Sequence, residues 1–140
     1  MTKRFRTEKI LAVIDMAPAH SRFLPLHAQA RLFSNVLNQI EQAISEGQPV
    51  IVQDFPDSSV ADELNCTHAF ITDALSTYEY KCFSTKHQND GSEEILELCR
   101  RQGYPTQHIQ LCGLFTNLCI RDTAIGLAKA QPDSLSLIHI

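Results

Sequence analysis

The sequence lacks long apolar runs, an excess of basic residues, and any internal repeat or low-complexity segment. No run approaches the ~20 consecutive apolar residues that a membrane-spanning helix needs. Twelve Lys and Arg residues against 16 Asp and Glu give a formal charge of −4, so the composition offers no basic surface for nucleic acid. We therefore expect neither a membrane nor a nucleic acid as a partner.

The five cysteines form no CxxC motif, and the six histidines show no metal-ligand spacing. The odd number of cysteines and the lack of a visible secretory signal favour reduced thiols in a cytoplasmic protein. The sequence thus predicts neither a disulfide framework nor a zinc site.

With 140 residues, of which 44% are hydrophobic and 20% charged, the composition is that of one globular domain, assigned to residues 1–140. Short apolar runs typical of parallel strands alternate with helical patterns. This order predicts a Rossmann-like, three-layer α/β/α domain with a mainly parallel sheet of about five strands. The expected strands are 10–14, 49–53, 77–83, 108–112 and 134–140; the expected helices are 27–46, 90–103 and 117–129, and 55–76 shows only a possible helical turn.

In an open parallel sheet, ligands bind beyond the carboxyl ends of the strands. Asp15 and Asp54 follow the first two expected strands, and Lys81 lies late in the third. Cys119 follows the fourth, near the start of a helix whose dipole and free N–H groups favour a thiolate. We therefore expect Asp15, Lys81 and Cys119 to converge, with Lys86 as a second candidate for the lysine.

Such a trio has a chemical logic. A carboxylate can accept the thiol proton and return it to a leaving group, and a nearby lysine favours the thiolate. On this argument the pKa of Cys119 should lie below its ordinary value of about 8.5.

The same residues resemble the isochorismatase-like cysteine hydrolases, a family of nicotinamidases, N-carbamoylsarcosine amidases and isochorismatases. The resemblance covers about residues 9–140 except 55–76. It rests on an Asp after the first strand, a Lys before a Ser/Thr pair, and a G-x-x-T-N-x-C turn with a trailing Thr-Ala, which here are Asp15, Lys81, Ser84-Thr85, Gly113–Cys119 and Thr123-Ala124.

The resemblance implies roles for these residues. Cys119 would be the nucleophile, Asp15 the general base and acid, and Lys81 their electrostatic partner. It also implies a cis peptide between Leu114 and Phe115, which would aim the Phe115 N–H, with the Cys119 N–H, at the oxyanion of the reaction.

Nicotinamidases place metal ligands after the second strand as Asp-x-His. Here Asp54-Phe55-Pro56-Asp57 keeps the aspartate and lacks the histidine. We therefore predict no metal ion and no other cofactor, and we assign Asp54 as a possible pocket-lining carboxylate.

Together these features predict a cysteine hydrolase that acts on a small amide-like (C–N) substrate through a thioester and forms a homo-oligomer, as relatives often do. One alternative is a non-catalytic α/β binding or assembly subunit that retains the fold. Another is a thiol redox sensor, which would use Cys119 without needing Asp15 or Lys81.

Overall fold

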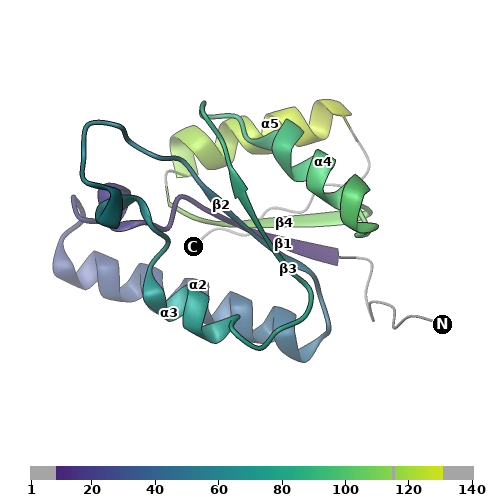
Figure 1. The fold of residues 1–140 in the computed structure, drawn as a ribbon, viewed down its shortest axis with the longest axis horizontal. Helices are drawn as coiled ribbons and strands as arrows, with labels where there is room; N and C mark the ends of the chain where they lie inside the picture. The colour runs from purple at the N-terminus through teal and green to yellow at the C-terminus, as the bar shows by residue number, and fades with distance from the viewer. Residues whose placement is uncertain (1–8, 115, 131–140) are drawn as a thin grey trace.

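The computed structural model describes residues 9–114 and 116–130. Its strands form one parallel sheet in the order β3-β2-β1-β4 (Figure 1). They are β1 (Lys9–Ile14), β2 (Val50–Asp54), β3 (Lys81–Thr85) and β4 (His108–Gly113). The strand expected at 134–140 lies outside the described residues.

Helices cover both faces of the sheet, which confirms the three-layer α/β/α prediction (Figure 1). On one face lie α2 (Leu26–Ser45) and α3 (Ala69–Ala74), and on the other α4 (Ser92–Gln102) and α5 (Arg121–Ala130). Shorter turns occupy the loops: α1 (Pro18–Ser21), the 3₁₀ turn η1 (Asp62–Asn65) and the π-helical turn η2 (Thr116–Ile120) that leads into α5.

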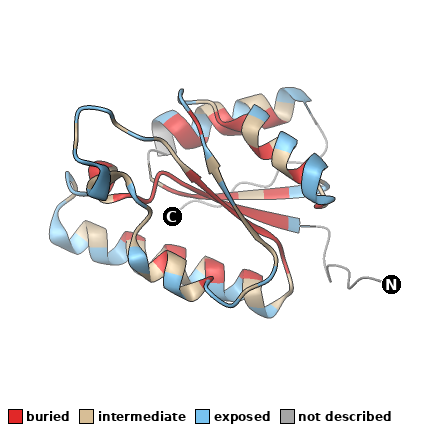
Figure 2. Cartoon of the chain, viewed as in Figure 1, coloured by how far each residue is buried: buried red, intermediate tan, exposed pale blue. Residues whose placement is uncertain are grey.

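The core follows from the two-residue alternation of β1, a strand buried on both faces (Figure 2). Ile10 and Ile14 pack with the α4 and α5 side chains, whereas Leu11 and Val13 pack with those of α2 and α3. None of the helices in the described ranges is long and apolar enough to cross a membrane.

The strand β3 begins later in the chain than the strand-forming residues at 77–83 indicate. Residues 77–80 precede it, because the Tyr78 hydroxyl donates to the Gln48 carbonyl at 2.7 Å and its ring packs against the α2/α3 core. Pairing with β2 begins only at Lys81, which lies opposite Val50 at the start of that strand. The expected strand at 77–83 is therefore wrong at both ends, and Lys81 begins the strand.

Gly113 ends β4 where that strand closely approaches β1. Its φ is +127°, and a Cβ there would lie 2.1 Å from the Ile14 carbonyl oxygen. Because backbone strain adds to this clash, we expect Gly113→Ala to lower the free energy of unfolding by about 3 kcal/mol in urea titrations. Gly103→Ala is the matched control, since its φ is +70° and nothing lies within 4 Å; it should cost only about 1 kcal/mol. Equal losses for the two variants would contradict this account.

Candidate active site

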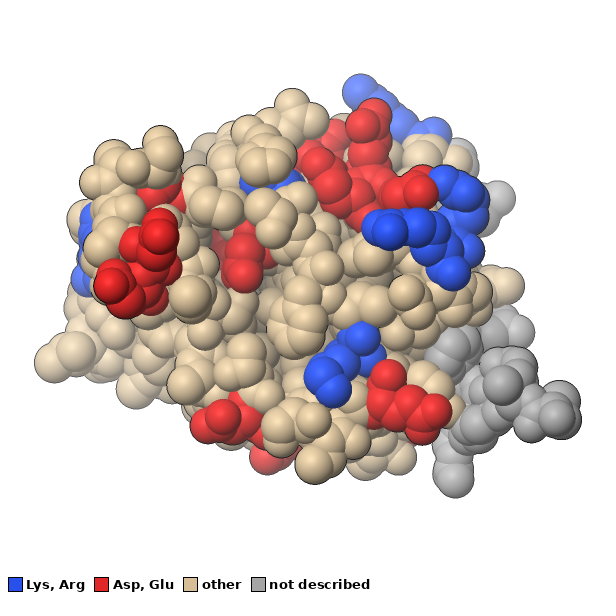
Figure 3. All heavy atoms as spheres, viewed as in Figure 1, with Lys and Arg blue, Asp and Glu red and all other residues tan. Residues whose placement is uncertain are grey.

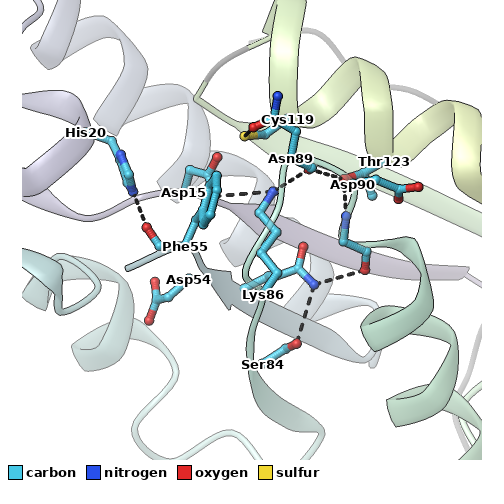
Figure 4. Close-up of polar contacts among 12 residues, drawn as sticks. Asp15, His20, Asp54, Phe55, Ser84, Lys86, Asn89, Asp90, Cys119 and Thr123 are labelled. Atoms are coloured by element: carbon cyan, nitrogen blue, oxygen red, sulfur yellow. Dashed lines mark hydrogen bonds and ion pairs between the residues drawn. The ribbon is translucent and has the colours of Figure 1, made fainter. Parts of the chain in front are cut away.

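The carboxyl ends of the strands bring Asp15, Lys86 and Cys119 together (Figure 4). Asp15 directly follows β1, and Lys86 directly follows β3. Cys119 lies in η2, where the chain turns from β4 toward α5. The convergence of an aspartate, a lysine and this cysteine is the arrangement that the sequence predicts, with a different lysine.

Asp15 is held in an uncommon backbone conformation. Its φ is +60°, a value that few non-glycine residues adopt, and its N–H donates to the Gln53 carbonyl of β2 at 3.0 Å. The residue is fully buried, and neither carboxylate oxygen has a hydrogen-bond partner within ordinary distance among the described residues. Strained backbone and an unsatisfied buried carboxylate are typical of functional sites.

Lys86 supplies the positive charge of the site. Its Nζ lies 3.6 Å from Asp15 Oδ1 and donates to the Asn89 carbonyl at 2.9 Å. It also lies 5.3 Å from the centroid of the Phe55 ring. Both ends of the ion pair are 0% exposed, so the attraction acts without solvent screening.

Lys81 is not part of this group, which corrects the prediction made from the sequence. Its Nζ donates to the Tyr78 carbonyl at 2.7 Å, at the amino end of the sheet. The reason is the position of β3: Lys81 begins that strand, and Lys86 follows its end. The rule that ligands meet strand carboxyl ends would have selected Lys86 had the strand been placed correctly.

The thiol of Cys119 is 2% exposed and donates to Asn89 Oδ1 at 3.6 Å. Burial and, to a smaller degree, the neighbouring Asp15 carboxylate raise its pKa to about 12, while the Lys86 charge opposes both. The expectation of a low pKa is therefore wrong. A helix N-terminus favours a thiolate, but burial beside a carboxylate outweighs it here.

Burial also raises the pKa of Asp15. This effect outweighs the Lys86 charge and the Cys119 thiol, which both lower that pKa. Thiol and carboxyl thus both favour holding a proton, and each shifts the pKa of the other. Two such groups titrate as a pair.

Sequence reasoning missed Asn89, which connects the parts of the site. Its carbonyl accepts from Lys86 and, at 3.2 Å, from the Thr123 hydroxyl, while its side chain accepts from Cys119. Thr123 in turn accepts the Gly91 N–H at 3.0 Å. The sequence feature that points toward Asn89 is Thr123, because its place after the G-x-x-T-N-x-C turn indicates a buried residue near the nucleophile.

Asp54 ends β2 and belongs to a neighbouring polar group. Its Oδ1 accepts the Thr67 hydroxyl at 2.6 Å, and burial raises its pKa. His20 lies nearby and hydrogen-bonds the Phe55 carbonyl through Nε2 at 2.7 Å. Across residues 9–114 and 116–130, no three His, Cys, Asp or Glu side chains are grouped to hold a metal ion. The donor set around Asp54 in the described residues therefore does not fit a metal ion.

The expected cis peptide and the Phe115 N–H cannot be placed, since residue 115 lies outside the described residues. A groove of about 1000 Å³ lies elsewhere, between β3 and α4, and its lining includes none of the three site residues.

Comparison with solved structures identifies the fold; no family model and no curated protein matches the chain. A nicotinamidase from Staphylococcus aureus matches with a TM-score of 0.73 at 13% identity, covering 95% of this chain and 80% of that one. N-carbamoylsarcosine amidase from Thermoplasma acidophilum gives 0.69 at 20% identity, over 96% and 82%. A ribonuclease from Caenorhabditis elegans gives 0.75 at 16%, over 99% and 65%.

Together with an isochorismatase that also matches, these structures show that the chain has the isochorismatase-like hydrolase fold. These matching proteins are named for different activities, a nicotinamidase, an amidase and a ribonuclease among them. The fold alone therefore leaves the reaction to be argued from the site.

Proposed function

We propose that the protein is a cysteine hydrolase that cleaves a C–N bond in a small amide-like substrate, with Cys119 as nucleophile, Asp15 as general base and acid, and Lys86 as their electrostatic partner. The observation that carries this proposal is the buried convergence of these three side chains at the carboxyl ends of the strands. A structural ion pair does not need a thiol beside it, and a buried structural cysteine does not need an ion pair.

The first half of the reaction forms a thioester. The Cys119 proton passes to Asp15 as the sulfur attacks the substrate carbonyl carbon, and the carbonyl π electrons move onto oxygen. The C–N bond then breaks, and the proton on Asp15 goes to the departing nitrogen, so that a neutral amine or ammonia leaves.

The second half releases the acid product. Asp15, again ionised, accepts a proton from water while the water oxygen attacks the thioester carbonyl. Collapse of the tetrahedral intermediate breaks the C–S bond, and the proton returns to sulfur. Asp15 thus acts as base and acid once in each half, which its raised pKa suits.

Lys86 favours the ionised form of Asp15 and compensates the negative charge when the thiolate forms. The Cys119 N–H is proposed as one oxyanion donor, and the Phe115 N–H remains a prediction as the other.

Asp54 is proposed to line the approach of the substrate, with its carboxylate hydrogen-bonded to Thr67. We also propose a reducing, cytoplasmic location, in which the five cysteines would stay as thiols.

Release of ammonia or amine from a panel of small carboxamides and carbamoyl compounds tests this function. We expect Cys119→Ala to lower turnover by at least about 10³-fold, and mass spectrometry of a quenched parent reaction to find the acyl group on the Cys119 peptide. Cys66→Ser is the matched control, because that thiol is exposed and contacts only the Asp62 carbonyl among the described hydrogen bonds. Activity that survives in Cys119→Ala would refute the nucleophile assignment.

One observation favours the second candidate, a non-catalytic binding or assembly subunit. Asp15 and Lys86 are 0% exposed and Cys119 is 2% exposed, so the site is closed to substrate in this conformation. If the panel yields no turnover and Cys119 resists labelling even at alkaline pH, the trio is a structural element and this second function stands.

A further inference from the structure

The β3 strand has an open edge. It pairs with β2 on one side and, in the described part of the chain, with nothing on the other. The Val50 N–H donates to the Tyr80 carbonyl, and the Lys86 N–H donates to the Asp54 carbonyl. Because main-chain groups alternate along a strand, those of Tyr80, Cys82, Ser84 and Lys86 face β2. Those of Lys81, Phe83 and Thr85 therefore face outward.

Residues 82–85 of this outward edge carry no charge, and the one lysine of the strand, Lys81, donates back to the Tyr78 carbonyl. Lys81–Thr85 contains no proline, and the central Phe83 side chain is 51% exposed. Open edges with apolar residues pair readily with another strand. Three residues offer six main-chain groups, each an N–H donor or a C=O acceptor, in a straight row.

A groove beside this edge carries charges of both signs. It is lined by β3 and by acidic and basic residues of α4 (Figure 3). Arg100 and Arg101 both pair with the single carboxylate of Glu97. Glu93 and Glu94 have no ion-pair partner among the described residues, and Glu94 Oε1 is buried without a hydrogen bond. The acidic half of α4 thus lacks cations, and the basic half shares one anion.

The two halves of α4 lie at opposite ends of β3. The Gly91 carbonyl, just before the helix, accepts from Gln53 Nε2, which also donates to the Ser84 hydroxyl late in β3. Just after the helix, the Tyr104 hydroxyl lies 3.5 Å from Cys82 Sγ, early in β3. The helix therefore runs antiparallel to the strand, with its glutamates beside the end of β3 and its arginines beside the start.

We propose that a second copy of this chain adds to the β3 edge across a two-fold axis at Phe83, which joins the two sheets into one. In an antiparallel pair centred there, Phe83 exchanges both main-chain hydrogen bonds with the partner's Phe83. Lys81 does the same with the partner's Thr85, and Thr85 with the partner's Lys81. All six outward groups are then satisfied.

Charge selects the antiparallel arrangement. The two-fold axis places the end of one β3 against the start of the other, so Glu93 and Glu94 face the partner's Arg100 and Arg101. A parallel arrangement would set glutamates against glutamates and would not close into a dimer. The same surface is therefore complementary to itself, as a two-fold interface requires.

The mass of the protein in solution, measured by light scattering over a range of concentrations, tests the proposal. We expect a dimer for the parent and a monomer for Phe83→Pro, because proline removes the central outward N–H and leaves the pairing with β2 intact. Phe83→Thr, which keeps that N–H, is the matched control and should retain more dimer than the proline variant. Circular dichroism confirms that each variant is folded.

Charge reversal provides a second test that does not alter the strand. The double variant E93R/E94R and the double variant R100E/R101E should each shift the protein toward monomer by at least tenfold in dissociation constant. Combining all four substitutions restores opposite charges across the axis and should restore the dimer. Thiol labelling of Cys119 should be unchanged throughout, so this result is independent of the proposed enzyme activity.

Three outcomes would overturn the proposal. One is a parent that stays monomeric at every concentration. Another is a dimer that persists in Phe83→Pro, which would place the contact elsewhere, for example at the exposed Phe23 and Leu26 side chains. The third is a quadruple charge variant that remains monomeric while folded, which would assign the edge to a different kind of partner.

Discussion

Replacing Lys86 with methionine is expected to lower the free energy of unfolding by about 3–5 kcal/mol, because the buried Asp15 carboxylate loses its cation. Methionine keeps the volume and length of the side chain, so the loss reports the charge and its hydrogen bond to Asn89 rather than a cavity. Urea unfolding at neutral pH, followed by circular dichroism, measures it.

Lys81→Met is the matched control. That ammonium donates to main-chain carbonyls at the other end of the sheet and has no ion-pair partner within the described residues, so its loss should cost about 1 kcal/mol or less. A larger cost for Lys81→Met than for Lys86→Met would show that the structure assigns the buried lysine wrongly.

The pH dependence of the Lys86→Met loss has a definite sign. Burial already raises the pKa of Asp15 above 3.8, and removing Lys86 removes the largest effect that opposes the rise. The carboxyl therefore gains its proton at a higher pH in the variant than in the parent. Because the neutral acid needs no cation, the difference in stability between parent and variant should shrink as the pH falls from 7 toward 4.

The sequence predicts the fold and two of the three site residues because each depends on local pattern. Buried strands read as unbroken apolar runs, so the ends of β1 and β2 and the residues that follow them are evident. The inner face of α2 recurs at Val36 and Ile40, between Pro25 and Gly47, which predicts both of its ends to within a residue. Cys119 is marked by the glycine that ends β4 and the turn that follows.

The remaining errors come from tertiary contacts. Tyr78 and Tyr80 favour a strand by composition, yet Tyr78 packs in the loop before β3, and this shifted the strand and selected Lys81 instead of Lys86. The low pKa expected for Cys119 rests on its position at a helix start and on a nearby lysine. The high pKa of Cys119 comes instead from burial beside Asp15, which depends on how two segments far apart in the sequence pack together.

The second large effect concerns Asp15→Asn, which should change two properties of the site in opposite directions. The asparagine keeps the shape of the side chain but removes the negative charge that raises the pKa of Cys119, while Lys86 continues to lower it. The thiol pKa should therefore fall from about 12. At a pH well below the thiol pKa, the thiolate fraction rises about tenfold for each unit by which that pKa falls. Labelling of Cys119 at pH 8 should therefore be at least about tenfold faster in Asp15→Asn than in the parent.

Turnover should instead fall by about 10²–10⁴-fold in Asp15→Asn, because no group remains to deliver a proton to the departing nitrogen. Iodoacetamide labelling, read at each cysteine by mass spectrometry over pH 6–11, measures the first effect, and ammonia release measures the second. Asp54→Asn is the labelling control, since that carboxylate bonds Thr67 and is absent from the causes that shift Cys119. A site in which Asp15 only holds the loop in place would lose activity without any gain in labelling. Faster labelling together with lost turnover separates a proton carrier from a structural carboxylate.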